Sequence, residues 1–317
     1  MILLAGLPDE PPMALVREAL EDSGAPFHMF DQRGHAESEI IYGVDQTSGM
    51  LGGTLRLGDG APIDLGQITS IYHRMHGAQS FEDLAAGPSD RPDVRRFNDL
   101  VSRFTAFCDA FEGRVMNRSP GMVTNNSKPL QAQIIARNGF LVPKTLITNS
   151  RTRALDFIAA NAASGKETIY KSASSVRSIV KTITARDVEK DLSIRACPVQ
   201  FQERVEGEDY RVHVVGEEIF ASRIATSGVD YRYANRDPDG STEIFEADVP
   251  ADVRKHAVKL AKALDLMLAG IDLRRTPEGA WYCFEVNPSP AFSYYEAHTG
   301  QPIAAAIAAA LAPMVDE

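Results

Sequence analysis

The chain has 317 residues, 44% of them hydrophobic and 24% charged, which is the composition of a folded protein too long for one typical domain. Its net charge of -10 at pH 7 argues against nucleic acid as a partner, because a polyphosphate backbone is bound by clustered positive charge. The three cysteines are dispersed without a C-x-x-C pair, and the first residues form no signal peptide, so we expect a reduced, cytoplasmic protein without a membrane span.

The first 116 residues alternate short apolar runs with helical patterns. Residues 2–6 form an apolar run that ends in glycine, residues 12–23 place apolar side chains at helical spacing, and residues 27–30 form a second run. Such a strand–helix–strand opening is typical of an α/β layer. After a glycine-rich stretch, residues 70–75 indicate another strand, and residues 92–112 a helix with apolar positions three and four apart.

The rest of the chain divides into two further predicted units, residues 117–198 and residues 199–317. The former opens with a helix over 127–139, which begins after a capping serine and ends at a glycine, and continues with strands around a second helix. The latter contains a hairpin that turns at Gly216, a helix, and two strands joined by a turn at 276–279. Together these elements predict the α/β (α+β) fold class.

The last two predicted strands carry an oxygen-rich set of side chains. Asp272 lies in the first strand, and Glu285 and Asn287 lie in the second, where a spacing of two puts them on one face. If the strands pair antiparallel, Asp272 joins them, and two carboxylates with an amide oxygen suit Mg²⁺ that also binds nucleotide phosphates. The alternative is a pair of solvated acids, which the apolar surroundings disfavour because an unpaired buried acid is costly.

Two lysines are candidates for contacts with a nucleotide phosphate. Lys171 ends a strand and precedes a small, polar loop, where it can act as a point charge while loop amides add donors. Lys128 lies at the start of the helix predicted over 127–139. Taken alone, each lysine equally fits an ordinary surface position. The Gly165-Lys166 pair lacks the remainder of a P-loop, and no G-x-G-x-x-G is present, so a nucleotide site of either type is excluded.

The segment FQERVEGEDYR runs from a strand into a short acidic turn. The backbone of Glu203 to Val205 could bind an adenine edge, and Asp209 could accept hydrogen bonds from ribose hydroxyls. Arg211 and Arg223 could face phosphates. The alternative for these acids and arginines is a solvated hairpin with weak surface ion pairs.

These features occur in one order along residues 117–317, and that order resembles the ATP-grasp superfamily. The residues are Lys128, Lys171, the hinge Gln202-Glu203-Arg204-Val205, Asp209, Arg223, Asp272, Glu285 and Asn287. Within the superfamily the chain is similar to the ribosomal-protein glutamate ligases and, more closely, to the ligases that cross-link graspetides. The segments SKPLQAQIIARNGFLVPKTLITN, GIDLRR and EVNPSPAFSYYE carry the closer resemblance.

The resemblance implies a pre-ATP-grasp N-terminal α/β domain over residues 1–116 and two α+β lobes that hold ATP between them. It implies that Lys128 and Lys171 contact phosphates and that the Asp272, Glu285 and Asn287 set holds two Mg²⁺ ions. The remaining implied roles are catalytic for Lys171, Arg223 and Arg274, nucleotide-binding for the hinge residues Gln202, Glu203, Arg204 and Val205 with Asp209, Arg211 and Arg223, and substrate-binding for Arg74, Tyr231, Arg232 and Arg274.

Two departures from the graspetide ligase pattern concern the substrate side. The sequence has Tyr72-His73-Arg74-Met75 where that branch often has an Arg-Arg-Pro element, and its lid is reduced to SASSVRS. Residues 1–116 resemble the family's N-terminal domain only loosely.

The predicted function is therefore that of an ATP-dependent ligase. It would join a carboxylate to an amine or hydroxyl through an acyl-phosphate, releasing ADP and phosphate, with a peptide side chain of a ribosomal precursor as one candidate substrate. Two alternatives stay open: a ligase for small amino acids on the same fold, and a catalytically silent module that binds nucleotide and peptide. The intact Asp272, Glu285 and Asn287 set disfavours the silent module. A homodimer is compatible with the sequence, which decides neither the assembly nor the bond type.

Overall fold

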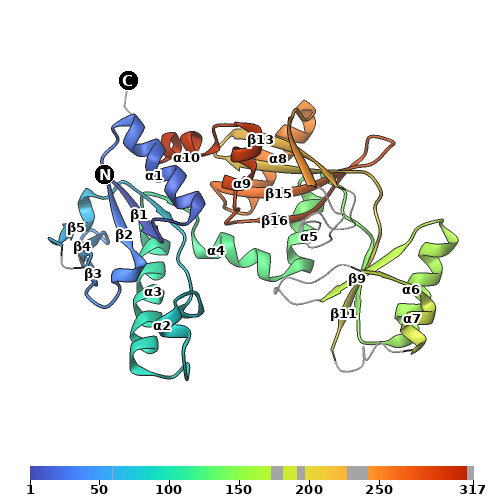
Figure 1. The fold of residues 1–317 in the computed structure, drawn as a ribbon, viewed down its shortest axis with the longest axis horizontal. Coiled ribbons are helices and arrows are strands. Elements are labelled where there is room, and N and C mark those ends of the chain that lie inside the picture. The colour runs from blue at the N-terminus through green and yellow to red at the C-terminus, as the bar shows by residue number, and fades with distance from the viewer. Residues whose placement is uncertain (59, 173–180, 191–196, 227–241, 313–317) are drawn as a thin grey trace.

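The computed structural model describes residues 1–58, 60–172, 181–190, 197–226 and 242–312. Its mixed α/β architecture confirms the predicted fold class. Three regions follow one another along the long axis of the molecule (Figure 1): an N-terminal domain, a middle region that contains β15 and β16, and a region that contains β9 and β11. No helix among the described residues has the length and apolarity that a bilayer span requires.

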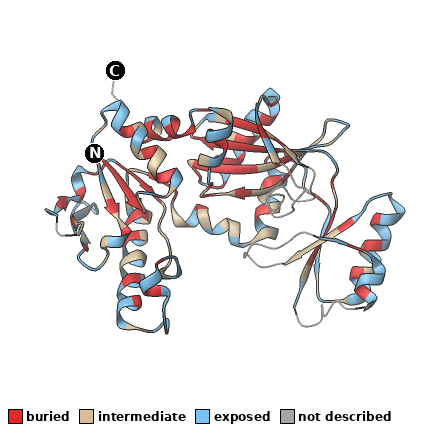
Figure 2. Cartoon of the chain, in the orientation of Figure 1, coloured by how far each residue is buried: buried red, intermediate tan, exposed pale blue. Residues whose placement is uncertain are grey.

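The N-terminal domain is built on a parallel sheet with strand order β2-β1-β6-β7. All five residues of β1 are buried, because one helix layer covers each face. Leu3 and Ala5 pack with α3, whereas Ile2 and Leu4 pack with α1 and with α10 from the end of the chain. Figure 2 shows these central strands as a buried layer between more exposed helices.

The elements of this domain have the following bounds. They are β1 (Ile2–Gly6), α1 (Pro11–Ser23), β2 (Phe27–Asp31), η1 (Gln32–Gly34), β3 (Glu39–Val44), β4 (Leu51–Arg56), β5 (Ile63–Asp64), η2 (Leu65–Gln67), β6 (Ser70–His73), η3 (Ala78–Ser80), α2 (Glu82–Ala85), α3 (Pro92–Ala110) and β7 (Arg114–Met116). Strands β3, β4 and β5 form a separate antiparallel sheet.

The region that contains β9 and β11 is an antiparallel sheet of order β10-β9-β11-β8 with α6 and α7 on one face. We call it the central sheet because its strands lie in the middle of the sequence, although it lies at one end of the molecule (Figure 1). Tyr170 and Phe201 pack beneath these helices, so their sequence neighbours Lys171, Gln200 and Gln202 point to the opposite face. The bounds are α4 (Ser119–Met122), η4 (Val123–Asn126), α5 (Lys128–Arg137), β8 (Thr145–Thr148), α6 (Arg151–Ala163), β9 (Thr168–Ser172), β10 (Lys181–Ile183), α7 (Ala185–Lys190) and β11 (Val199–Glu203).

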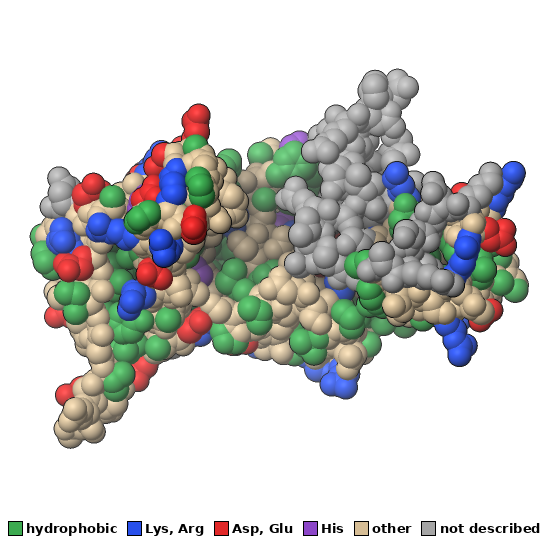
Figure 3. All heavy atoms as spheres, turned by 90° about the horizontal axis from the view of Figure 1, so that it is seen from below, with side chains coloured by type: hydrophobic (Ala, Val, Ile, Leu, Met, Phe, Trp, Pro, Cys, Tyr) green, Lys and Arg blue, Asp and Glu red, His purple; other side chains and the backbone are tan. Residues whose placement is uncertain are grey.

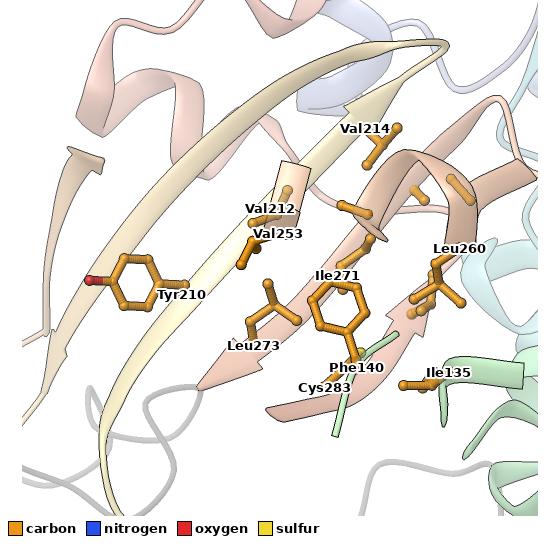
Figure 4. Packing of buried hydrophobic residues seen from close by; sticks show 14 of the residues in the cluster. Ile135, Phe140, Tyr210, Val212, Val214, Val253, Leu260, Ile271, Leu273 and Cys283 are labelled. Carbon is orange, nitrogen blue, oxygen red and sulfur yellow. The ribbon is translucent and has the colours of Figure 1, made fainter. Parts of the chain in front are cut away.

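The C-terminal region is a five-stranded antiparallel sheet of order β14-β13-β12-β15-β16. Its apolar face packs against α8 and α5 in the largest core cluster, where Val212 and Ile271 face Leu260 and Phe140 (Figure 4). The bounds are β12 (Glu208–Val215), β13 (Glu218–Thr226), β14 (Thr242–Ala247), α8 (Ala251–Ala263), β15 (Leu268–Arg275), β16 (Trp281–Asn287), α9 (Ser293–Thr299) and α10 (Ile303–Leu311).

Two segments lie in a different region from the one that the sequence suggests. Strand β11, placed by sequence in the third unit, pairs with β8 and β9 and so completes the central sheet. Helix α5, placed by sequence in the second unit, packs on β16 through Ile135. Hydrophobic pattern predicts each element but not which sheet it joins, and the three-unit division of the chain stays a prediction.

Candidate active site

The oxygen-bearing side chains of Asp272, Glu285 and Asn287 share one face of the C-terminal sheet, on its edge strand β16 and the neighbouring β15. Strands β15 and β16 pair antiparallel, with Asp272 opposite Glu285 and Gly270 opposite Asn287. Residues that lie directly opposite each other in a sheet project to the same side, so Asp272, Glu285 and Asn287 come together as their pattern predicts. The register shifts between Asp272 and Leu273, which leaves Phe284 as an extra residue, as in a β-bulge.

This set has the chemistry that Mg²⁺ requires. It offers carboxylate and amide oxygens without sulfur or nitrogen donors, and Mg²⁺ binds in proteins through a few such oxygens while it keeps waters or phosphates as further ligands. In the described parts of the chain no three His, Cys, Asp or Glu side chains gather as a metal site. The predicted set contains only two carboxylates, Asp272 and Glu285, and the amide oxygen of Asn287 is its candidate third donor.

Arg211 lies on the same face, one strand away. Its guanidinium contacts the Asp272 carboxylate at 2.5 Å and lies 5.7 Å from the Tyr295 ring centroid of α9. It also passes over Gly270, where an added Cβ would come within 2.6 Å of Arg211 Nη2. A residue without a side chain is needed at position 270 because the arginine occupies that space, and its charge offsets one of the two carboxylates.

A cavity of about 510 Å³ opens between the central sheet and β16. Lys171 and Gln202 enter it from the polar face of the central sheet, Lys128 from the start of α5, and Glu285 from the oxygen-rich face. Its other lining residues are Pro129, Gln131, Ala132, Val142, Pro143, Thr145, Ile147, Gln200, Cys283 and Phe284. The structure thus brings both predicted phosphate-binding lysines to the same space as a predicted metal ligand.

The hinge after β11 has its charged side chains outside this cavity. Glu203 is buried and accepts hydrogen bonds from the Lys144 N–H at 2.9 Å and from Lys166 Nζ at 2.5 Å. Burial raises the pKa of Glu203, but the Lys144 amide and the Lys166 ammonium outweigh it and hold that pKa below its usual value. Arg204 pairs with the Glu167 carboxylate. A nucleotide contact at these positions would therefore involve the backbone.

Arg274 ties the hinge to the C-terminal sheet. It donates to both carboxylate oxygens of Asp209 and to the Val205 carbonyl, each at 2.7 Å. The guanidinium also lies 5.2 Å from the Phe284 ring centroid. Such a bidentate pair is geometrically specific. These contacts join the hinge to β15 and engage both Asp209 oxygens, while the catalytic role expected for Arg274 and the ribose contact expected for Asp209 stay predictions.

Known proteins resemble this chain in sequence and in fold. Residues 125–311, more than half of the chain, match the family described as RimK-like ATP-grasp domain. The chain belongs to the RimK-like ATP-grasp family. A relative in Shewanella halifaxensis, named probable alpha-L-glutamate ligase, is 26% identical over 75% of this chain. The chain spans 52% of that relative's length.

Two solved structures share the fold. The RiPP-associated ATP-grasp ligase of Chryseobacterium gregarium, in complex with ADP and a leader and core peptide, has a TM-score of 0.79 at 19% identity. The structural match covers 98% of this chain and 97% of that ligase. The ATP-grasp ligase PsnB, complexed with minimal precursor, Mg and ADP, has a TM-score of 0.76 at 24% identity, with 98% of this chain and 96% of that chain covered.

Arg223 does not reach the candidate site of this RimK-like protein. In the β12–β13 hairpin it lies opposite Tyr210, whereas Arg211 lies opposite Ser222, so the two arginines project to opposite faces of the sheet. Arg223 instead pairs with Glu208 at 3.1 Å. This register corrects the expectation that Arg211 and Arg223 both face the phosphates. The position of the hairpin turn determines the register.

The predicted substrate-side residues are separated along the chain. Tyr231 and Arg232 lie outside the described residues, as does the SASSVRS loop from Ala173 onward. Arg74 immediately follows β6 of the N-terminal domain and contacts the loop that follows Asn287. Its position next to the predicted metal ligand Asn287 was not anticipated from the sequence.

Sequence reasoning also missed two buried amides that hold β16 and its loop. Gln131 of α5 exchanges two hydrogen bonds of 2.9 Å with the backbone of Val286. Asn117 donates to the carbonyls of Leu268 and Pro288 at 2.7 Å each. The available signal for Gln131 was its place four residues before Ile135, on the apolar face of α5, where a polar side chain needs a partner.

Proposed function

We propose that this protein is an ATP-dependent ligase that joins a carboxylate to an amine or hydroxyl through an acyl-phosphate and releases ADP and phosphate. The observation that carries the proposal is that one cavity is lined by Lys128, by Lys171 and by Glu285 of the oxygen-rich face. A nucleoside triphosphate in this cavity would meet the two lysines on one side and the predicted Mg²⁺ ligands on the other. A silent binding module has no need of that second set.

In this mechanism the chain positions the reactants and offsets charge. Asp272, Glu285 and Asn287 would hold Mg²⁺, which when bound neutralises charge on the β- and γ-phosphates. Lys128 and Lys171 stabilise the phosphates from the opposite wall. A substrate carboxylate oxygen attacks the γ-phosphorus and ADP leaves. The amine or hydroxyl then attacks the acyl carbon, phosphate leaves, and the nucleophile's proton passes to solvent.

We propose a peptide or protein side chain as the substrate, in preference to a free amino acid. The proposal is supported by two neighbours with the same fold that are complexed with precursor peptides. The glutamate ligase names of the sequence relatives keep an amino acid as the second reactant open. We also propose the cytoplasm as the compartment, since Cys108, Cys197 and Cys283 are all free thiols.

The nucleotide product tests the proposed chemistry. Incubation with ATP, Mg²⁺ and candidate acids or peptides should give ADP and phosphate, because metal held at the β- and γ-phosphates activates the terminal phosphoryl group. Phosphorus NMR identifies the products, and hydroxylamine should capture the acyl-phosphate as a hydroxamate. AMP and pyrophosphate as products would refute the acyl-phosphate route. A parallel reaction without ATP must give no hydroxamate.

Lys171→Met should weaken ATP binding while leaving adenosine binding unchanged. The lost partner is a phosphate contact, and a hydrogen bond to a charged group contributes about 1.5–3 kcal/mol, so a loss of roughly tenfold or more is expected. Calorimetric titration with both ligands measures the difference. Lys181→Met is the matched control, since Lys181 is exposed on the neighbouring β10 and lies opposite Tyr170. Equal losses for ATP and adenosine would return Lys171 to a structural role.

A further inference from the structure

We propose that Glu10 and Arg74 of the N-terminal domain are a positioning pair that fixes the loop 287–290 and thereby sets the affinity of the site for Mg²⁺. The inference rests on the proposed function, because it assumes that Asn287 is a metal ligand. It differs from a substrate role for Arg74, which the sequence alone suggests. Its basis is a continuous chain of hydrogen bonds between the N-terminal domain and Asn287.

The first link joins Glu10 to Arg74. Glu10 immediately precedes α1, and its Oε1 accepts from Arg74 Nε at 2.9 Å and from Arg74 Nη2 at 2.6 Å. Its Oε2 lies 3.1 Å from His76 Nε2. The side chains of Glu10 and Arg74 are only 17% and 10% exposed. Burial raises the pKa of Glu10, but Arg74 and His76 outweigh it and hold that pKa below its usual value, which keeps the carboxylate charged.

The second link joins Arg74 to the loop after β16. Arg74 Nη1 donates to Ser289 Oγ at 3.0 Å and to the Pro290 carbonyl at 3.2 Å. The Ser289 N–H in turn donates to Asn287 Oδ1 at 2.9 Å. An amide oxygen has two acceptor sites, so this bond orients Asn287 and leaves its oxygen able to bind a metal.

A separate contact holds the same loop from the other side. The buried Asn117 donates to the Pro288 carbonyl at 2.7 Å. Two side chains from earlier in the sequence thus bond this loop. Asn117 donates to the Pro288 carbonyl, and Arg74 donates to the Ser289 hydroxyl and the Pro290 carbonyl. The N-terminal domain and Asn117 therefore hold the loop in addition to its attachment to β16.

The geometry of Arg74 explains why it positions the loop instead of binding substrate. Its Nε, Nη1 and Nη2 atoms all bond to groups of the chain itself. A neighbouring cavity of about 400 Å³ is lined by Glu10, Arg74, His76 and Ser289, so the pair also forms part of a wall. Residues that orient metal ligands typically change metal affinity by roughly 10–100-fold when they are replaced.

The test uses the full chain and three conservative variants, Arg74→Lys, Glu10→Gln and Ser289→Ala. Lysine keeps the charge of Arg74 but cannot bond Glu10 and the loop through one planar group. ADP binding is titrated calorimetrically over a series of Mg²⁺ concentrations and again in EDTA. We expect the Mg²⁺ concentration for half-maximal enhancement of ADP binding to rise roughly 10–100-fold in Arg74→Lys and Glu10→Gln. ADP affinity in EDTA should stay near that of the parent, while the melting temperature falls modestly because a largely buried ion pair is weakened.

Arg33→Lys is the matched control. Arg33 also belongs to the N-terminal domain and forms an ion pair, with Asp31 at 2.9 Å, but it is half exposed and makes no contact with the loop 287–290 that the structure describes. Its Mg²⁺ dependence should equal that of the parent. Arg74→Lys combined with Ser289→Ala should lose less Mg²⁺ affinity than the two single changes predict together, because both interrupt one path.

The outcomes separate the inference from the proposed function. Parent Mg²⁺ dependence in a folded Arg74→Lys protein overturns the positioning role, as does strict additivity in the double variant. A fall in ADP affinity in EDTA together with lower melting temperature assigns the pair to stability alone and also overturns it. If the parent itself binds ADP without any Mg²⁺ dependence, the proposed metal site fails, and the inference fails with it.

Discussion

Replacing Glu285 with alanine is expected to reduce ligation by roughly a thousandfold while the fold stays intact. Removal of a direct metal ligand costs several kcal/mol of transition-state stabilisation, and about 1.4 kcal/mol corresponds to tenfold in rate. Glu285 lies in the cavity beside the lysines and opposite Asp272, so its loss removes one of two carboxylates from the metal set. Initial rates of ADP release with saturating substrate, compared with circular dichroism, measure both effects.

Glu278→Ala is the matched control for this experiment. Glu278 lies at the turn of the same hairpin and is exposed, far along the strands from Asp272. It should keep the parent rate. A folded Glu285→Ala protein that releases ADP as fast as the parent would contradict the assigned metal set.

Arg274→Ala is expected to lower the free energy of unfolding by about 3 kcal/mol, near the lower end of the cost of breaking a buried ion pair. The two partners are 18% and 12% exposed, so solvent can offset only part of the loss. The substitution leaves the Asp209 carboxylate and the Val205 carbonyl without the donors that Arg274 supplies. Urea unfolding measures the change, and ATP binding should weaken as the hinge loosens.

This outcome differs from that of an arginine at a reacting acyl-phosphate. Such an arginine, when removed, would slow product formation with little effect on stability. Arg275→Ala is the control, because Arg275 is the exposed neighbour on the same strand and should lose little stability. The double variant Asp209→Ala with Arg274→Ala should be less destabilised than the sum of the two single variants, since neither charge is then left alone. Parent stability in Arg274→Ala would disprove the hinge role.

The sequence was informative where function depends on local spacing. Asp272, Glu285 and Asn287 could be brought together in advance because a short turn joins two strands and side chains alternate along each. The same reasoning failed for Arg223, since its face depends on hairpin register and both arginines look alike without it. Charged side chains are also interspersed in sign over the N-terminal domain (Figure 3), so charge alone did not single out Arg74.

Residues that act through distant backbone groups could not be predicted at all. Gln131 and Val286 are 155 positions apart, and the partners of Asn117 include Pro288, 171 positions away. No periodicity or motif encodes such pairs, because a side-chain amide can bond any peptide group that the fold brings near. The bond from Arg74 to the Pro290 carbonyl, 216 positions away, belongs to the same class.

Helix α10 has a consequence for how the protein acquires its structure during synthesis. It is translated after every other described element, yet Ile303 and Ile307 belong to the hydrophobic cluster that contains Ile2 and Leu4 of the first strand. The hydroxyl of Ser70 and the guanidinium of Arg114 also bond carbonyls at its end. Domains usually fold in order as they leave the ribosome. Here the first sheet emerges early but keeps part of one face uncovered until translation has reached α10, so the sheet is completed only after that helix has been made.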